Sequence, residues 1–293
     1  MASDSTATPN AIGRYRIDRV LGAGAAGIVY RAYDPVLNRT VAIKSGRIEQ
    51  LDQSQLQHLM AEFRHEASIA GRFAHENIVA IYDLIEDRGL THIVMEYVTG
   101  RSVQEYLQSV GPMPVEAVLS IIYKCAEGLA YLHYNGVIHR DIKPGNILYH
   151  HAGDLVKIMD FSIAEAIDQP GPRESGTAAY MAPEHFDSTR KITPLTDVFA
   201  LGATMYRMLV KRYPFSRQNI AAEIMSAQQV PVHEIRPEIP LPVSQIVDRA
   251  MAKTDAARFQ SAAALAHEIE RVLGACYPGS LIASQRDAYM TSL

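Results

Sequence analysis

Hydrophobic and polar residues alternate along the first part of the chain. From Tyr15 to Ile48 the pattern has a period of two, and turn residues interrupt it at Gly22–Gly27 and Asp34–Asn38. Side chains of a strand point alternately to opposite faces of a sheet, so this pattern predicts three antiparallel strands. The same reasoning predicts two more strands, from Ile78 to Glu86 and from Thr91 to Tyr97.

Helical spacing replaces this alternation in two parts of the chain. Apolar residues recur every three or four positions from Gln53 to Gly71, which predicts one main helix within the β-rich part. Val98–Arg101 carries a glycine and no strong pattern, and we expect a hinge between two lobes there. The helices expected beyond it are Ser102–Ser109, Val115–Tyr134, Thr196–Leu209, Ile220–Gln229, Val243–Ala252 and Ser261–Leu273. The pattern therefore predicts an α+β, bilobal fold, in which a small antiparallel β-sheet lobe precedes a larger, mostly helical lobe.

Composition narrows the classes of partner. The 28 Lys+Arg and 32 Asp+Glu residues are spread along the chain, so no basic footprint for nucleic acid is expected. No apolar run is long enough to cross a membrane, so no membrane segment is expected in the chain. Cys125 and Cys276 have no metal-site or disulfide spacing, which favours a reducing compartment. We expect a cytoplasmic protein, or the cytoplasmic domain of a longer one.

A glycine-rich motif lies between the first two predicted strands. Gly22, Gly24, Gly27 and Val29 match the pattern G-x-G-x-x-G-x-V, in which missing side chains let backbone amides approach phosphate oxygens. A dinucleotide-binding fold would need a helix after the last glycine. Here Ile28–Tyr33 continues as a strand, so the glycines join a hairpin and that alternative is disfavoured.

Lys44 ends the run Val-Ala-Ile-Lys on the third predicted strand. From there its ammonium group could reach the α- and β-phosphates of a nucleotide under the glycine hairpin. A carboxylate of the following helix would orient it, and Glu66 is the favoured candidate. Glu62, one turn earlier on the same face, is the alternative.

The segment His139-Arg-Asp-Ile-Lys-Pro-Gly-Asn146, followed by Asp160-Phe-Ser162, resembles the protein kinase family. The resemblance runs from about Tyr15 to Leu273 and implies a protein-kinase-like fold. It implies that Asp141 accepts the proton of the substrate hydroxyl, while Asn146 and Asp160 hold Mg²⁺, with Mn²⁺ as an alternative. The catalytic residues that it implies are Asp141, Lys143, Lys44, Glu66 and Thr177. The ATP-binding residues that it implies are Leu21, Gly22, Gly24, Gly27, Val29, Ala42, Lys44, Met95, Glu96, Val98 and Leu148.

Two motifs resemble those of serine/threonine kinases. Lys143 lies two residues after Asp141, and Gly176–Glu184 is similar to the loop that docks serine or threonine substrates, with Thr177 expected to bond Asp141 and Lys143. The resemblance also implies an ion pair between Glu184 and Arg258 that braces this loop. Asp197, at the start of a helix, would accept backbone N–H bonds beneath the catalytic loop.

The chain departs from the family pattern at Ser162, where Asp-Phe-Gly is expected. Serine resists positive φ, so we expect Ser162 to bias this segment toward one of its two arrangements, active or inactive. Ser175 is a candidate phosphorylation site in the same activation segment, since Arg140 beside the catalytic Asp is typical of control by phosphate.

The residues support a serine/threonine protein kinase that uses Mg·ATP, phosphorylates proteins in signalling and also phosphorylates itself. Its relatives by resemblance are the bacterial Hanks-type kinases, several of which self-associate through the N-lobe. The alternatives are a pseudokinase scaffold and a small-molecule kinase. Small-molecule kinases lack the signatures that this chain carries at Lys143 and Ala182-Pro-Glu184, which disfavours the second alternative. The expected organisation is a disordered N-terminus (1–12), an N-lobe (13–98), a C-lobe (99–274) and a C-terminal tail (275–293).

Overall fold

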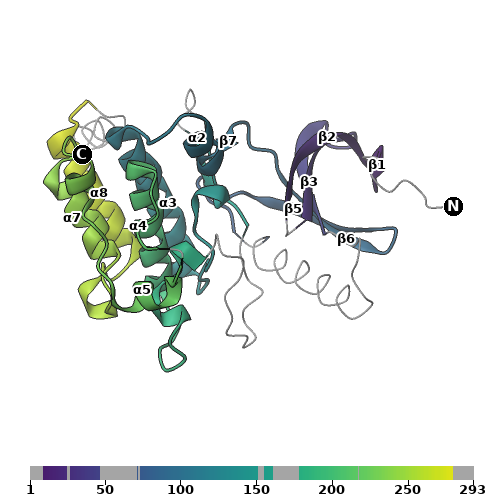
Figure 1. Ribbon diagram of the computed structural model, residues 1–293. Coiled ribbons are helices and arrows are strands. Elements are labelled where there is room, and N and C mark those ends of the chain that lie inside the picture. The colour runs from purple at the N-terminus through teal and green to yellow at the C-terminus, as the bar shows by residue number, and fades with distance from the viewer. Residues whose placement is uncertain are drawn as a thin grey trace. The chain divides into compact units, whose positions relative to one another are not determined.

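The structure is a computed structural model of the chain (Figure 1). It consists of two compact units, unit 1 being Met1–Thr99 and unit 2 being Gly100–Leu293. Each unit is described by itself. The residues that the structure describes are 9–24, 27–46, 71, 73–150, 155–160, 178–216 and 218–279.

Unit 1 contains a six-stranded antiparallel sheet with the strand order β1-β2-β3-β4-β6-β5. The strands are β1 (Ala11–Ile12), β2 (Tyr15–Gly24), β3 (Gly27–Asp34), β4 (Arg39–Ser45), β5 (Ile81–Asp87) and β6 (Leu90–Glu96). The three strands predicted between Tyr15 and Ile48 are confirmed as β2, β3 and β4, and the two later ones as β5 and β6. The predicted helix from Gln53 to Gly71 lies outside the described residues, apart from Gly71 itself.

Alternation of apolar residues explains the core of this sheet. One face buries Tyr15, Tyr30, Val41, Ile43 and Val94, which form a single cluster. Within β3 and β4 these residues occupy every second position, as strand geometry requires. The intervening residues lie on the opposite face, and that face carries several of the residues expected to bind a nucleotide.

Unit 2 is mostly helical. Its helices are α2 (Val103–Ser109), α3 (Val115–Tyr134), α4 (Pro194–Val210), α5 (Ile220–Ser226), α6 (Val232–Ile235), α7 (Leu241–Ala250) and α8 (Ala262–Cys276). The helices α3, α4, α7 and α8 pack together as one layer (Figure 1). Together with the sheet of unit 1, this confirms the predicted α+β class.

The central helix of this layer is α4, of which nearly every residue is buried. Pro194 occupies its first turn, where the fixed φ of proline suits a helix start, so α4 begins two residues before the predicted Thr196. Gly202 allows α4 to approach α7 closely, because a Cβ atom there would lie 2.7 Å from that of Ala250. The layer is therefore held by close helix contacts as well as by apolar side chains.

Several short elements of unit 2 were not predicted. A three-stranded antiparallel sheet consists of β7 (Arg101–Ser102), β8 (Ile147–His150) and β9 (Leu155–Ile158). Arg101 thus pairs in a strand, although it was expected to be hinge, because two residues are too short to show a periodic pattern. The 3-10 helices are η1 (Pro144–Asn146), η4 (Ala178–Tyr180), η5 (Pro183–His185) and η6 (Asp255–Ala257).

The helices give no candidate for a membrane span within the described residues. Of those in the described ranges, none combines the length and the apolar character that crossing a bilayer requires.

Candidate active site

One buried carboxylate organises the segment His139–Asn146. Asp197 lies in the first turn of α4, and its Oδ2 and Oδ1 accept hydrogen bonds of 2.8 Å from the backbone amides of His139 and Arg140, respectively. His133, near the end of α3, contributes a third contact of 2.8 Å between its Nε2 and Asp197 Oδ2. Burial by itself raises the pKa of Asp197, but the hydrogen bonds from His133 and from the His139 amide lower it below its ordinary value. The carboxylate is therefore ionised and fixes two consecutive amides of the segment.

Arg140 has a backbone conformation that needs this support. Its φ of 66° lies in the left-handed region. Such a conformation costs a residue other than glycine about 1 kcal/mol or more. The hydrogen bond from its amide to Asp197 offsets part of that cost.

His139 joins the segment to the end of β9. It is fully buried, and burial lowers the pKa of its imidazole, so the ring is neutral. Its Nδ1 accepts a hydrogen bond of 3.3 Å from the amide of Asp141, which leaves Nε2 to donate to the carbonyl of Met159 at 3.2 Å. The neutral ring thus fixes the backbone on either side of the candidate site.

The two carboxylate oxygens of Asp141 have different surroundings. Oδ2 accepts hydrogen bonds from Lys143 Nζ at 2.7 Å and from Asn146 Nδ2 at 2.9 Å. Oδ1 is buried and has no hydrogen-bond partner in the structure, as far as its residues are described. A buried acceptor without a partner is unfavourable by about 1–3 kcal/mol, and a ligand that donates a hydrogen bond to it would remove that cost. Asp141 is therefore oriented through one oxygen and keeps the other available.

Asn146 and Asp160 come from neighbouring segments. The amide of Met159, one residue before Asp160, donates a hydrogen bond of 2.9 Å to the carbonyl of Asn146. Next to this bond, Ile147 pairs with Ile158 across β8 and β9. Asn146 also donates through Nδ2 to the Asp141 carbonyl at 2.9 Å, and Asp160 has a left-handed φ of 57°. The pairing of β8 and β9 thus brings an amide and a carboxylate, whose oxygens can bind a metal, to the same end of these two strands.

A buried ion pair braces the segment that follows. Glu184 of η5 bonds Arg258 through both oxygens, at 2.7 Å to Nη1 and 2.8 Å to Nη2. Thr196 Oγ1 donates a further bond of 2.8 Å to Glu184 Oε1. Burial raises the pKa of Glu184, whereas the bonds and charge of Arg258 lower it, and the net result lies below the ordinary value. The ion pair that the sequence predicted between Glu184 and Arg258 is present.

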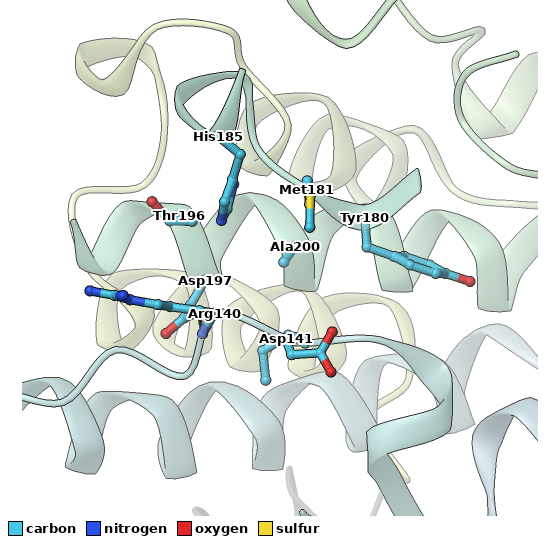
Figure 2. A pocket seen from close by; sticks show the side chains of 9 residues that line it. Arg140, Asp141, Tyr180, Met181, His185, Thr196, Asp197 and Ala200 are labelled. Carbon is cyan, nitrogen blue, oxygen red and sulfur yellow. Dashed lines mark hydrogen bonds between the residues drawn. The ribbon is translucent and has the colours of Figure 1, made fainter. Parts of the chain in front are cut away.

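A small pocket lies between these two segments (Figure 2). Arg140 and Asp141 line it from one segment, and Tyr180, Met181 and His185 from the other (Figure 2). Its remaining lining residues are Ile142, Thr196, Asp197 and Ala200. Asp141 therefore lines a small hollow that it shares with residues of the segment Tyr180–His185.

In unit 1 the glycine motif forms the predicted hairpin. Gly24 and Gly27 are the last paired residues of β2 and β3. Gly27 has a φ of 131°, and a Cβ atom there would lie only 2.1 Å from the backbone oxygen of Ser45. Only glycine fits this position. The close approach of β4 therefore requires glycine here, in addition to the expected binding of phosphate.

Several of the expected nucleotide contacts share one face of this sheet. Val29 lies opposite Lys44 in the pairing of β3 and β4, and Ala42 lies opposite Met95 in the pairing of β4 and β6. Cross-strand partners point to the same face, and so do residues two apart, which places these four side chains together. Gly22 pairs with Val29, and Leu21 lies at a bulge of β2 next to it. The structure thus brings these residues together within unit 1.

The other expected residues are more scattered. Glu96 ends β6 and pairs with Val41, and Val98 follows β6 outside any strand. Leu148 belongs to unit 2, where it pairs with Ser102 and Lys157. Four expected residues lie outside the described part of the chain, namely Glu66, Thr177, Ser162 and Ser175.

Sequence reasoning missed His133. No motif in the sequence singles out His133, yet it bonds the carboxylate that organises the site. Its position 64 residues before Asp197 gives no local signal. Only the packing of α3 against α4 brings the two together.

Comparison with known proteins agrees with this geometry. The family model described as the protein kinase domain matches residues 15–269. The chain is 35% identical over 270 residues to serine/threonine-protein kinase PrkC of Bacillus subtilis, an alignment that covers 90% of this chain and 41% of that protein. It is 33% identical over 279 residues to serine/threonine-protein kinase PknB of Mycobacterium leprae, covering 91% and 44%, respectively. It is 35% identical over 263 residues to serine/threonine-protein kinase PknD of Mycobacterium tuberculosis, covering 87% and 39%.

These matches assign the family. The chain belongs to the protein kinase domain family, and the predicted similarity to bacterial Hanks-type kinases is confirmed. Use of ATP and a divalent metal ion follows from the family. The chain spans less than half the length of these curated relatives.

Proposed function

We propose that this chain transfers the γ-phosphate of ATP to serine and threonine hydroxyls of proteins, including its own. The observation that carries the proposal is the carboxylate of Asp141, with Oδ2 bonded by Lys143 and Asn146 and Oδ1 buried without a partner among the described residues. A general base needs an acceptor within hydrogen-bond reach of the proton that it removes. A substrate hydroxyl that donates to Oδ1 would be oriented for attack on the γ-phosphorus. Its proton would pass to Oδ1 as the new O–P bond forms and the bond from the γ-phosphorus to the leaving ADP breaks.

The side-chain chemistry of unit 2 fits a divalent metal. Mg²⁺ prefers oxygen ligands, and Asn146 and Asp160 supply an amide and a carboxylate oxygen from adjoining segments. We assign the site to Mg²⁺, with Mn²⁺ as an alternative. When bound, the metal neutralises charge on the phosphate oxygens and so favours transfer.

The face of unit 1 that carries Val29, Ala42, Lys44 and Met95 fits the nucleotide. Valine and alanine side chains supply apolar contacts for an adenine ring, and the backbone of Glu96 and Val98 supplies hydrogen bonds for its edge. Lys44 is buried and lies on the same face, where an ammonium group would bind the α- and β-phosphates. Glu66 would orient Lys44, in keeping with its expected role. The resemblance also implies nucleotide contacts from Leu21, Gly22, Gly24 and Gly27 on the glycine hairpin and from Leu148 of β8.

Preference for serine and threonine rests on two residues. Lys143 bonds Asp141 at 2.7 Å, so its charge lies beside the base and would contact the transferring phosphoryl group. Thr177 would bond Asp141 and Lys143 in the docked complex. The relatives named as serine/threonine kinases support the same preference.

Asp141→Asn tests the proposal. Asparagine keeps the size of the side chain but lacks the basic carboxylate, so the rate of phosphate transfer to a protein substrate should fall by about 10²–10⁴-fold. Glu238→Gln is the matched control, since it makes the same change at a side chain that is 63% exposed. Equal rates in wild type and Asp141→Asn would overturn the assignment. The pseudokinase alternative predicts no transfer by the wild type either.

Three features of the whole protein follow as proposals. The lengths of the relatives support a kinase domain within a longer protein, and we expect that domain to act on the cytoplasmic side. Protein substrates follow from the proposed activity. Self-association through the N-lobe is supported by Val36 and Leu37, which are 70% and 54% exposed at the turn between β3 and β4.

A further inference from the structure

Lys253 makes contacts that the proposed chemistry does not explain. It lies between α7 and η6, and its Nζ donates a hydrogen bond of 2.8 Å to the carbonyl of Ile224 in α5. The same Nζ lies 3.9 Å from the ring centroid of Phe215 and 5.9 Å from that of Phe199 on α4. One ammonium group thus contacts three separate parts of unit 2.

The carbonyl of Ile224 is one that the helix cannot satisfy by itself. The last four carbonyls of a helix have no intrahelical partner, and α5 ends at Ser226. A cation at this end also interacts favourably with the helix dipole. Since α5 has only seven residues, tertiary contacts of this kind decide whether it stays in place.

The position of α5 bears on the candidate site. It packs against η4 and η5, the two 3-10 helices of the segment Ala178–His185. Tyr180, Met181 and His185 of that segment line the pocket at Asp141. A displacement of α5 therefore changes the surface beside the base without touching Asp141 itself.

A purely structural role would not require a charge at this position. Burial and then the neighbouring Arg258 lower the pKa of Lys253 to about 8, so the fold disfavours the ammonium form. Arg258 itself pairs with Glu184 and lies near Asp255, which in turn pairs with Arg190. These groups are therefore paired with one another. An apolar side chain of similar length would fill the space without this desolvation. Desolvation of the Lys253 ammonium group thus lowers the stability of the fold. Unlike an apolar side chain, however, this group makes a hydrogen bond and contacts aromatic rings.

We propose that Lys253 is a positioning residue for the protein substrate, which it serves by holding the C-terminal end of α5 against Phe215 and so fixing the docking surface formed by α5 and Ala178–His185. The role rests on the proposed kinase activity. It goes beyond that activity because it assigns recognition of the protein substrate to a residue that contacts neither ATP nor the reacting atoms. Loss of the ammonium group should weaken substrate docking and leave nucleotide binding unchanged.

Lys253→Met and Lys253→Arg form the test pair. Methionine keeps the length and removes the charge, whereas arginine keeps the charge and the donors. With a generic basic protein as substrate, Lys253→Met should raise the KM for the protein about tenfold and leave the KM for ATP within about twofold. Its melting temperature should change little, because removal of a partly desolvated charge offsets the loss of the hydrogen bond to the Ile224 carbonyl. Lys253→Arg should keep both KM values near those of the wild type.

Hydrogen exchange of the α5 amides supplies a readout that needs no activity. Exchange at 220–227 should become faster in Lys253→Met than in the wild type, whereas exchange in α3 stays the same. An unchanged KM for the protein together with unchanged exchange in α5 would overturn the proposal. A fall in melting temperature with a parallel rise in both KM values would also overturn it, in favour of a structural role. An inactive wild type would refute the kinase proposal instead, and the exchange measurement would still decide whether Lys253 holds α5.

Discussion

Replacing Asp197 by asparagine should separate the orientation of the catalytic loop from its chemistry. The carboxylate accepts from the amides of His139 and Arg140 and contacts His133, each at 2.8 Å. An asparagine side chain has the same shape but offers only one accepting oxygen. Placing that oxygen at the Oδ2 position keeps the bonds to His139 and His133, so the new NH₂ group faces the amide of Arg140.

The magnitude follows from these contacts. A buried amide that loses its partner destabilises the protein by about 1–3 kcal/mol, and bonds to a charged acceptor are about twice as strong as neutral ones. Arg140 also loses support for its left-handed backbone. The sum is a loss of about 3 kcal/mol in the free energy of unfolding of unit 2. Since residue 141 follows Arg140 directly, kcat should fall by about 10²-fold through misplacement of the base.

Urea denaturation and steady-state kinetics measure the two effects. Glu238→Gln again serves as the control, with little change expected in either quantity because its side chain is exposed. A variant Asp197→Asn that unfolds at the wild-type urea concentration and keeps its kcat would refute the reasoning. Loss of kcat at full stability would show that the loop, but not the fold, depends on this carboxylate.

Two further predictions concern unit 1 and the response to acid. Gly27→Ala should raise the KM for ATP by about tenfold or more, because its Cβ would lie 2.1 Å from the backbone oxygen of Ser45. Gly89→Ala is the control for backbone strain alone, since Gly89 also has a positive φ but a Cβ there would have no atom within 4 Å. The free energy of unfolding should fall as pH drops through 6.5, since burial lowers the pKa of both His92 and His139. The unfolded imidazoles then bind protons that the folded ones do not, so the contribution present above pH 6.5 is lost towards the lower folded pKa values. His92→Gln should reduce this slope, as measured by urea denaturation at several pH values, and an unchanged slope would contradict the burial argument.

Much of the fold could be predicted because its strands and helices are periodic. The alternation in β3 and β4 and the helical spacing in α3 reflect burial of one face, and a local pattern records that directly. The sheet of β7, β8 and β9 escaped prediction because its strands have only two or four residues. Pairing partners far along the chain, and not local periodicity, define such strands.

The residues of the candidate site likewise divide into those that local motifs predict and those that only distant partners define. Asp141, Asn146 and Asp160 could be proposed from motif order, and Asp197 from its place at a helix start. The motifs could not reveal that Asp141 has one bonded oxygen and one without a partner in the described part of the chain, because that difference depends on the positions of Lys143 and Asn146. His133 and Lys253 carry no local signal, since their partners lie 64 and 29 residues away.

The central claim concerns the group that receives the phosphate. Incubating the wild-type chain with Mg·ATP labelled at the γ-phosphate and a protein substrate, and then identifying the labelled amino acids, measures it directly. The account predicts label on serine and threonine, with little on tyrosine and almost none in the Asp141→Asn reaction. Label on tyrosine alone would contradict the substrate assignment, and label of equal strength in Asp141→Asn would contradict the role of Asp141 as base.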